Sequence, residues 1–276
     1  MLREWCAKQP HLPKISDVQL AVFLHCCDSS VEATKTRIDL YFTMRTHAPE
    51  FLSNRDPVES EGLRFTIKNV AYIPLRKPTD DGHVIVYTKW IDPDPTRFSI
   101  DDYITYANMM CDLWIHTQGS HPGCQVVINA QGLTMAHLSR LNLIGLKKHA
   151  LYLQDAFPIR IKRIHLTNVV PAVDIVVRML KRVMQKEVIK MLHFHSTAET
   201  LAKFIPLDAL PNEDGGNAGT LADLMAETTT WLEDKIAWLQ TEEATARVNE
   251  SLRPGKGKTS SDVFGIEGTF KKLEFD

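Results

Sequence analysis

Residues 255–260 read GKGKTS, a run of glycine, lysine and hydroxyl side chains that could hold a phosphate group. The phosphate-binding loop of nucleotide enzymes needs a further glycine, which would fall at Leu252, and a strand directly before it. The sequence has neither feature at this place. We therefore interpret residues 255–260 as a flexible, solvated linker.

Three histidines could bind a metal ion. His193 and His195 alternate along an expected strand, so their imidazoles share one face, and His165 on the neighbouring strand could join them. No HExxH motif and no carboxylate at ligand spacing accompanies them, although zinc sites are normally built from such sets. We interpret the three residues as hydrogen-bonded structural histidines and expect no bound metal.

The sequence contains no nucleophile elbow, no glycine-rich cofactor turn and no paired acids, so we expect neither an enzyme nor a cofactor. A formal net charge of −2 argues against nucleic-acid binding by the whole molecule, and a basic function would need a local patch. The five cysteines form no CxxC pair and their number is odd, which indicates a reduced, cytoplasmic protein. No signal peptide or membrane span is expected.

A local basic patch lies in residues 153–168, which read LQDAFPIRIKRIHLTN. The isoleucines of this run favour a buried strand, yet three basic residues interrupt it. Residues two apart share a face of a strand, so Arg160 and Lys162 would point the same way, and Ile159 and Ile161 the other. We expect the strand to begin at the protein surface with both charges in water. An ordinary solvated strand end is the alternative.

The elements that must position these residues fall into two parts. Residues 1–65 read as a small all-helical unit, in which Ser16 caps a helix over 17–27. Ser29 and Glu32 form a capping box for the next helix, which runs to about residue 46.

From residue 70 onward the apolar pattern switches to strands that alternate with helices. This order predicts an α/β fold with a mostly parallel sheet covered by helices on both faces. The expected strands are 70–75, 83–91, 124–130, 162–168 and 191–195, and the expected helices are 99–116, 138–153, 171–184 and 218–247.

Three segments at this spacing, FPIRIKRIHLTN, MLHFHS and IPLDALPNEDGG at 205–216, resemble the CRAL-TRIO lipid-binding family, and within it the group of the α-tocopherol transfer and retinaldehyde-binding proteins. The resemblance implies three parts: an N-terminal helical unit (1–65), the lipid-binding domain (66–225) and a C-terminal helix and tail (226–276). Asp214 departs from the family pattern, which has an aromatic residue there, and Asn129 stands where an acidic residue is common.

The resemblance further implies that the sheet forms the floor of an apolar pocket and that helix 171–184 is a mobile lid. Val177 lies on the wide apolar stripe of that helix, whose opposite face is basic, and a plain surface helix is the alternative. Tyr87 and His149 would contact a polar head group. By position, the wall residues are Tyr87, Ile104, Ala107, Cys111, Ile128, Leu133, Leu153, Ile159, Ile161 and Ile164, and the lid residues are Val173, Val176, Val177 and Leu180.

The resemblance implies that two basic residues, at the positions of Arg160 and Lys162, bind phosphoinositide head groups. Two more follow the lid, where Lys186 and Lys190 lie one residue away from the matching sites. We therefore expect a non-enzymatic cytoplasmic carrier of a retinoid, carotenoid, tocopherol or similar lipophile, with release at phosphoinositide-containing membranes. A membrane-recruited signalling module and a lipid-modifying enzyme are the alternatives.

Overall fold

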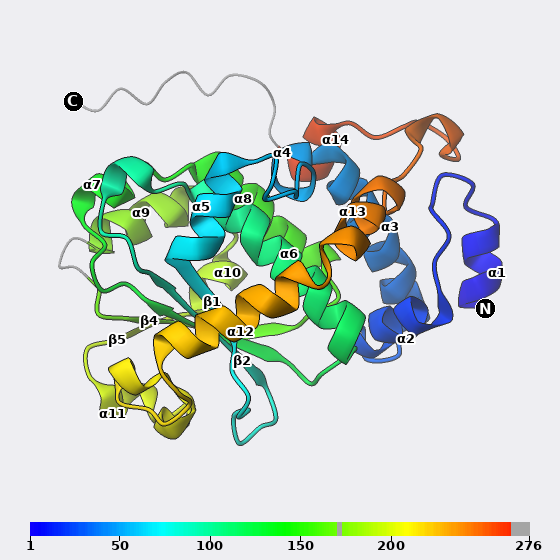
Figure 1. Ribbon diagram of the computed structural model, residues 1–276. Coiled ribbons are helices and arrows are strands. Elements are labelled where there is room, and N and C mark those ends of the chain that lie inside the picture. The colour runs from blue at the N-terminus through cyan, green and yellow to red at the C-terminus, as the bar shows by residue number, and fades with distance from the viewer. Residues whose placement is uncertain (170–172, 266–276) are drawn as a thin grey trace.

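The protein is an α/β structure, and a helical region precedes it in the chain (Figure 1). The computed structural model describes residues 1–169 and 173–265 and leaves the side chains of residues 173–176 and 183 undescribed. Its five-stranded sheet has the order β1-β2-β3-β4-β5. Strand β1 (Val70–Pro74) is antiparallel to β2 (Val84–Trp90), and the other pairs are parallel. These are β3 (Cys124–Asn129), β4 (Ile161–Thr167) and β5 (Leu192–His195).

The mostly parallel sheet predicted from the sequence is confirmed, because each expected strand is present within two residues of its expected ends. Helix α6 (Ile100–Gln118) connects β2 to β3. Helix α8 (Leu143–Leu151) and the π-helix η2 (Tyr152–Ala156) precede β4. Helices α9 (Val173–Val183) and α10 (Lys186–Lys190) precede β5. Long helical crossovers of this kind are what parallel pairing requires.

The remaining elements are short or lie at the chain's two ends. Helix α7 (Met135–Leu138), helix α11 (Ala198–Leu201) and the 3₁₀ turns η1 (Pro95–Arg97), η3 (Leu207–Ala209), η4 (Asn212–Asp214) and η5 (Glu250–Leu252) connect the larger ones. The single closing helix expected over 218–247 is two helices, α12 (Leu221–Glu233) and α13 (Ile236–Thr245), and α14 (Ser260–Phe264) follows. No helix in the described ranges is long and apolar enough to cross a membrane.

The helical region contains α1 (Leu2–Ala7), α2 (Asp17–Cys26), α3 (Val31–His47), α4 (Pro49–Leu52) and α5 (Glu61–Asn69). Ser16 caps α2 as expected, in a capping box with Gln19. The cap of α3 is Ser30 rather than Ser29, since Ser30 accepts from the amide of Ala33. Ser29 lies in the left-handed region with φ 64°, in the turn between the two helices.

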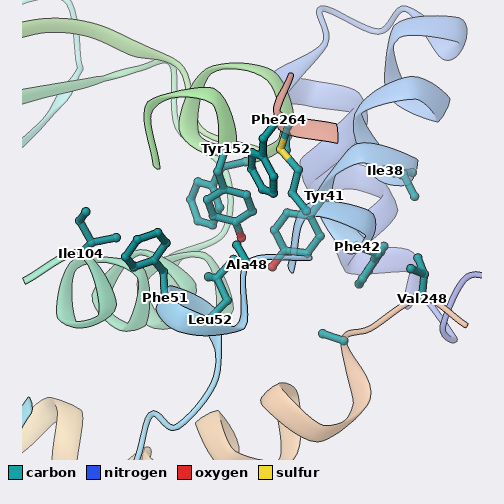
Figure 2. Packing of buried hydrophobic residues seen from close by; sticks show 14 of the residues in the cluster. Ile38, Tyr41, Phe42, Ala48, Phe51, Leu52, Ile104, Tyr152, Val248 and Phe264 are labelled. Carbon is teal, nitrogen blue, oxygen red and sulfur yellow. The ribbon is translucent and has the colours of Figure 1, made fainter. Parts of the chain in front are cut away.

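The helical region has no separate core of its own. Figure 2 shows Tyr41 and Phe42 of α3 packed with Tyr152 of η2, and with Val248 and Phe264 from the C-terminal segment. Ion pairs also join the helical region to the rest of the fold. Arg45 of α3 contacts Asp112 of α6 at 3.0 Å and also contacts Glu242 of α13. Arg45 and Asp112 are both buried, and each has a second partner, Glu242 for Arg45 and Arg55 for Asp112, so the buried charges compensate one another in a network.

Candidate ligand-binding site

The two faces of the sheet have different surroundings. Strand residues alternate, so Val84 and Val86 of β2 face α6, while Ile85 and Tyr87 face α11 and α12. Parallel pairing continues this alternation into the neighbouring strand, because Tyr87 pairs with Val127 and Thr88 pairs with Ile128. The face toward α11 and α12 is closely packed, whereas the face toward α6 borders a cavity.

The cavity has a volume of about 520 Å³. The sheet forms one wall, α6 and α8 form a second, and α9 with α10 forms a third. A pocket of this size is typical of small-molecule sites, which are mostly apolar with a few polar groups. Its apolar lining includes Val84, Val86, Met110, Cys124, Val126, Leu146, Leu166, Val188, Leu192 and Phe194.

A bulge in β4 decides which residues of the basic segment face the cavity. Cys124 pairs with Ile161, but the next residue, Gln125, pairs with Arg163, so Lys162 is an extra residue in β4. Strict alternation would turn Ile164 away from Ile161, and the inserted residue restores it to the same side. Ile161 and Ile164 therefore both line the cavity.

The cavity wall contains part of the expected set. The structure brings together seven of the residues that the resemblance suggested: Ala107, Cys111, Ile128, Leu153, Ile159, Ile161 and Ile164. Of the lid residues, Val177 and Leu180 line the cavity from α9, while the side chains of Val173 and Val176 lie outside the described residues.

Three expected wall residues lie elsewhere. Tyr87 is on the opposite face of the sheet, where its hydroxyl donates to the carboxylate of Asp214. Asn129 donates to the same carboxylate at 2.9 Å, so the two positions that depart from the family pattern are hydrogen-bonded to each other. Ile104 is fully buried in the core shared with the helical region and is two helical turns from Cys111 along α6, outside the lining of the cavity. Leu133 lines a separate, shallow surface pocket beside Trp90.

Several cavity residues were not identified from the sequence. Tyr103, Met110 and Trp114 line it from α6. Their spacing from Ala107 and Cys111 is three or four residues, so the helical period could have indicated them. Phe194 on β5 also lines the cavity and is 41% exposed, which no sequence pattern signalled.

The rim of the cavity carries the basic residues, and here the expected geometry was wrong. Arg160 and Lys162 both border the cavity together with Ile159 and Ile161, instead of pointing away from it. The bulge and the irregular chain before β4 break the simple alternation. Lys186 and Lys190 are exposed on α10 and do not line the cavity.

Arg160 is not a free cation. Its Nη1 donates to Asp28 at 2.7 Å and its Nη2 donates to the carbonyl oxygen of His25 at 2.6 Å. Asp28 lies in the turn between α2 and α3, with φ 50°. The helical region therefore holds one of the rim's basic side chains, whereas Lys162 is exposed.

The polar groups inside the cavity are uncharged. Burial lowers the pKa of His149 to about 4, so its imidazole is neutral at pH 7. Burial likewise raises the pKa of the Cys111 thiol to about 12, and its sulfur is hydrogen-bonded to the hydroxyl of Tyr72 at 3.2 Å. A protonated, hydrogen-bonded thiol is a poor nucleophile.

The three histidines of the sequence analysis lie on the packed face of the sheet. His165 Nδ1 lies 2.8 Å from His195 Nε2, and its Nε2 lies 2.7 Å from the side chain of Gln125. His195 in turn contacts the hydroxyl of Thr200 at 3.1 Å. Within the described ranges no group of histidine, cysteine or acidic side chains has the arrangement of a metal site.

Comparisons with known proteins place this geometry in a family. Residues 68–216 match the CRAL/TRIO domain, and residues 1–62 match the Pinta-like UBA domain. The chain is similar to proteins described as alpha-tocopherol transfer protein-like from Mus musculus and Homo sapiens. Each is 24% identical over 238 residues, which cover 83% of this chain and 66% of the relative, so the chain spans less than two thirds of their length.

One solved structure, titled crystal structure of Sfh5, is 14% identical, with a TM-score of 0.46 over 81% of this chain and 85% of that chain. The family assignment rests on the domain match, which spans more than half of the residues and includes the strands and helices around the cavity. This chain belongs to the CRAL/TRIO family.

Proposed function

We propose that this protein binds a small hydrophobic ligand in the cavity and carries it between membranes without altering it. The observation that carries the proposal is the apolar cavity of about 520 Å³ between the sheet and helices α9 and α10. Burial of apolar ligand surface there contributes about 25 cal/mol per Å². The names of the similar tocopherol transfer-like proteins support the same ligand class, which includes tocopherols, retinoids and carotenoids.

The chemistry of the wall supports a carrier rather than an enzyme. Cys111 is protonated and His149 is neutral, and neither is paired with a group that would activate it. Nucleophilic catalysis needs such a base beside the nucleophile. The ligand would therefore leave the cavity unchanged.

Release would take place at an anionic membrane. Opening of α9 exposes the apolar side chains of Val177 and Leu180, which a bilayer can cover. Lys162 at the rim and Lys186 and Lys190 on α10 are exposed and can attract a phosphoinositide head group. A head group that binds Arg160 would have to compete with Asp28. Such lipids are concentrated in cytoplasmic leaflets, and free cysteines suit the same compartment.

The direct test is to express the protein, extract it with organic solvent and identify the extracted lipid by mass spectrometry. We expect one class of neutral lipophile in roughly stoichiometric amount, and diphenylhexatriene fluorescence to rise when the emptied protein is titrated with this probe. Recovery of no lipid together with no binding of the probe would contradict the proposal. A stoichiometric protein partner found with an empty cavity would favour a membrane-recruited interaction module instead.

A further inference from the structure

A chain of hydrogen-bonded side chains crosses the sheet from the start of β2 to β5. His83 Nδ1 lies 3.1 Å from Gln125 Nε2, and Gln125 Oε1 lies 2.7 Å from His165 Nε2. His165 Nδ1 lies 2.8 Å from His195 Nε2, and His195 Nδ1 lies 3.1 Å from the hydroxyl of Thr200 on α11. We call these five residues the histidine relay. Its members on β3, β4 and β5 are buried, so the relay ties the edge strand β5 to the centre of the sheet.

Strand β5 connects the relay to the cavity. It is four residues long and, among the described strands, pairs with β4 alone. Its side chains alternate, so His193 and His195 lie on the packed face, where both contact the rings of His165 and Phe204. Leu192 and Phe194 lie on the other face and line the cavity. A movement of β5 would therefore change the relay and the cavity wall together.

The helices that cover the cavity directly precede β5 in the chain. Val177 and Leu180 of α9 line the cavity, as do Val188 of α10 and Met191 just after it. The carbonyl oxygen of Met191 accepts from the amide of Ile164 on β4 at 2.8 Å. Separation of β5 from β4 would therefore withdraw part of the wall and free the C-terminal end of the α9–α10 segment.

The ionisable groups that act on His165 and His195 are basic. Arg163 of β4 lies with its guanidinium 5.0 Å from the ring centre of Phe204, and His193 of β5 stacks beside His165. Burial is the first cause that lowers the pKa of His165, to about 3, and it also lowers the pKa of His195. Among the described residues no carboxylate is hydrogen-bonded to either histidine. A proton on one of them would be a buried charge without a counter-ion.

The far end of the relay is electrostatically more balanced. Burial, Lys162 and Arg163 lower the pKa of His83, whereas Asp81 raises it. The residues that contact the relay from α11 and the turn after it, Thr200 and Phe204, are uncharged. The relay is therefore most sensitive to protons at its β5 end.

Opening of β5 would change the proton affinity of this end. Once β5 leaves β4, His165 and His195 reach water, where a histidine has an ordinary pKa of about 6.5. Below this pH the open form takes up protons that the closed form does not bind until a much lower pH, so acid favours the open form. Above it neither form takes up these protons, and the equilibrium does not depend on them.

We propose that the histidine relay is a proton-sensitive latch. In its neutral state it holds β5 and, through β5, helices α9 and α10 over the cavity, and its protonation opens the cavity and releases the ligand. This inference rests on the proposed function, because it adds a control of release from the same cavity. An anionic membrane surface attracts cations, protons included, so the pH beside it lies below that of the bulk solution. Release would therefore be favoured at such a surface.

The first test measures the release of diphenylhexatriene. Protein loaded with this probe is mixed with an excess of phosphatidylcholine vesicles of no net charge, which contain a nitroxide-labelled lipid that quenches the probe on arrival. We expect the release rate to rise at least about 25-fold from pH 7 to pH 5, the factor for one histidine with an ordinary pKa in the open form alone. Far-UV circular dichroism at both pH values verifies that the protein stays folded.

Substitutions in the relay should remove this pH dependence. Replacing both histidines, with His165→Gln and His195→Gln, leaves side chains that form hydrogen bonds but do not titrate, and the rise should then fall below about threefold. Each single replacement should remove part of the rise and serves if the double variant fails to fold. His116→Gln is the matched control, because His116 is exposed on α6 and stacks on Trp238, and it should keep the wild-type ratio.

Hydrogen exchange provides a second measurement that needs no ligand. After correction for the intrinsic exchange rate at each pH, the amides of β5 and α10 should exchange faster at pH 5 than at pH 7, whereas those of β1 and β2 should not. The double variant should lose this difference.

Equal release rates at pH 7 and pH 5 in the wild-type protein would overturn the inference. A double variant with the wild-type ratio would overturn it as well and would point to His121 or His149 at the cavity instead. Faster exchange at pH 5 throughout the sheet would replace the latch by general acid unfolding. If diphenylhexatriene does not bind at any pH, the proposed function fails, and the exchange of β5 alone then decides whether the relay responds to protons.

Discussion

The same strands have a loosely filled apolar face that borders the cavity and a tightly filled face that combines an apolar core with buried polar side chains. On the cavity side, β3 and β4 present Cys124, Val126 and Ile164, and space remains between them and the helices. On the other side, the next residues along the strands include Gln125 and His165, and their polar atoms are bonded to each other. The comparison teaches that buried polar side chains do not mark the functional face here, because they belong to the filled face, and the unfilled space lies on the other.

The largest expected effect comes from placing a charge on the cavity side. Val177→Asp puts a carboxylate on the cavity side of α9, where burial without a partner costs several kcal/mol, so ligand affinity should fall by more than ~100-fold. Retention of co-purified lipid and titration with diphenylhexatriene measure the loss. Val18→Asp is the matched control, since Val18 is 70% exposed on α2, and it should bind normally. Normal binding by Val177→Asp would show that α9 does not cover the ligand.

The packed face should make the protein sensitive to acid. Burial first, and then the neighbouring His195, His193 and Arg163, lower the pKa of His165 to about 3. The unfolded chain takes up this proton near pH 6.5 and the folded chain does not until about pH 3, so the free energy of unfolding falls as the pH drops through this window. Above pH 6.5 the residue contributes no pH dependence.

Between pH 7 and pH 4 we expect this histidine to account for a loss of roughly 3 kcal/mol, which urea unfolding at several pH values measures. His165→Gln should be less stable at pH 7 but should lose less on acidification than the wild-type protein. An equal pH slope in both proteins would show that other groups govern acid unfolding.

Two adjacent valines test the faces directly. Val127 is 1% exposed in the packed core, and Val126 lines the cavity. Val127→Ala should lower the free energy of unfolding by about 2 kcal/mol, because it creates a void in a filled region. Val126→Ala should cost about half as much in the empty protein, since it enlarges an existing space, yet it should change ligand affinity. Urea unfolding and titration of the emptied protein with diphenylhexatriene separate the two effects, and equal stability losses would contradict the difference between the faces.

The smallest expected effect is at the rim. Each basic residue near an anionic surface contributes about 1 kcal/mol, so Lys162→Glu should weaken binding to phosphoinositide-containing vesicles by at least ~5-fold. Asp28→Asn should strengthen it by a similar factor, because it releases Arg160 for the head group. Co-sedimentation at low and high salt checks both changes, which salt should reduce.

Affinity for diphenylhexatriene should stay the same in both rim variants. Vesicle binding that neither substitution changes would leave the rim charges as ordinary solvated residues and Asp28 as a structural contact.

Much of the architecture followed from local patterns. Period-two and period-3.6 apolar residues located the strands and main helices, and their alternation implied parallel pairing. Ser16 marked the start of α2 because a capping hydroxyl acts on amides only three residues away. Likewise, three further cavity residues of α6 are spaced three or four residues from the predicted Ala107 and Cys111, since a helix repeats its faces at that period. Such features depend on neighbours in the chain, so the sequence by itself determined them.

Other features were decided only by contacts between distant segments. The bulge at Lys162 depends on how β4 registers against β3, and it alone turns Ile164 toward the cavity. The pairing of Arg160 with Asp28 joins residues 132 positions apart, and no local pattern signals it. The orientation of Tyr87 also depended on the tertiary structure. Alternation along a strand defines two faces but does not say which one borders the cavity. Only the packing of α6 against one face and of α12 against the other distinguishes them.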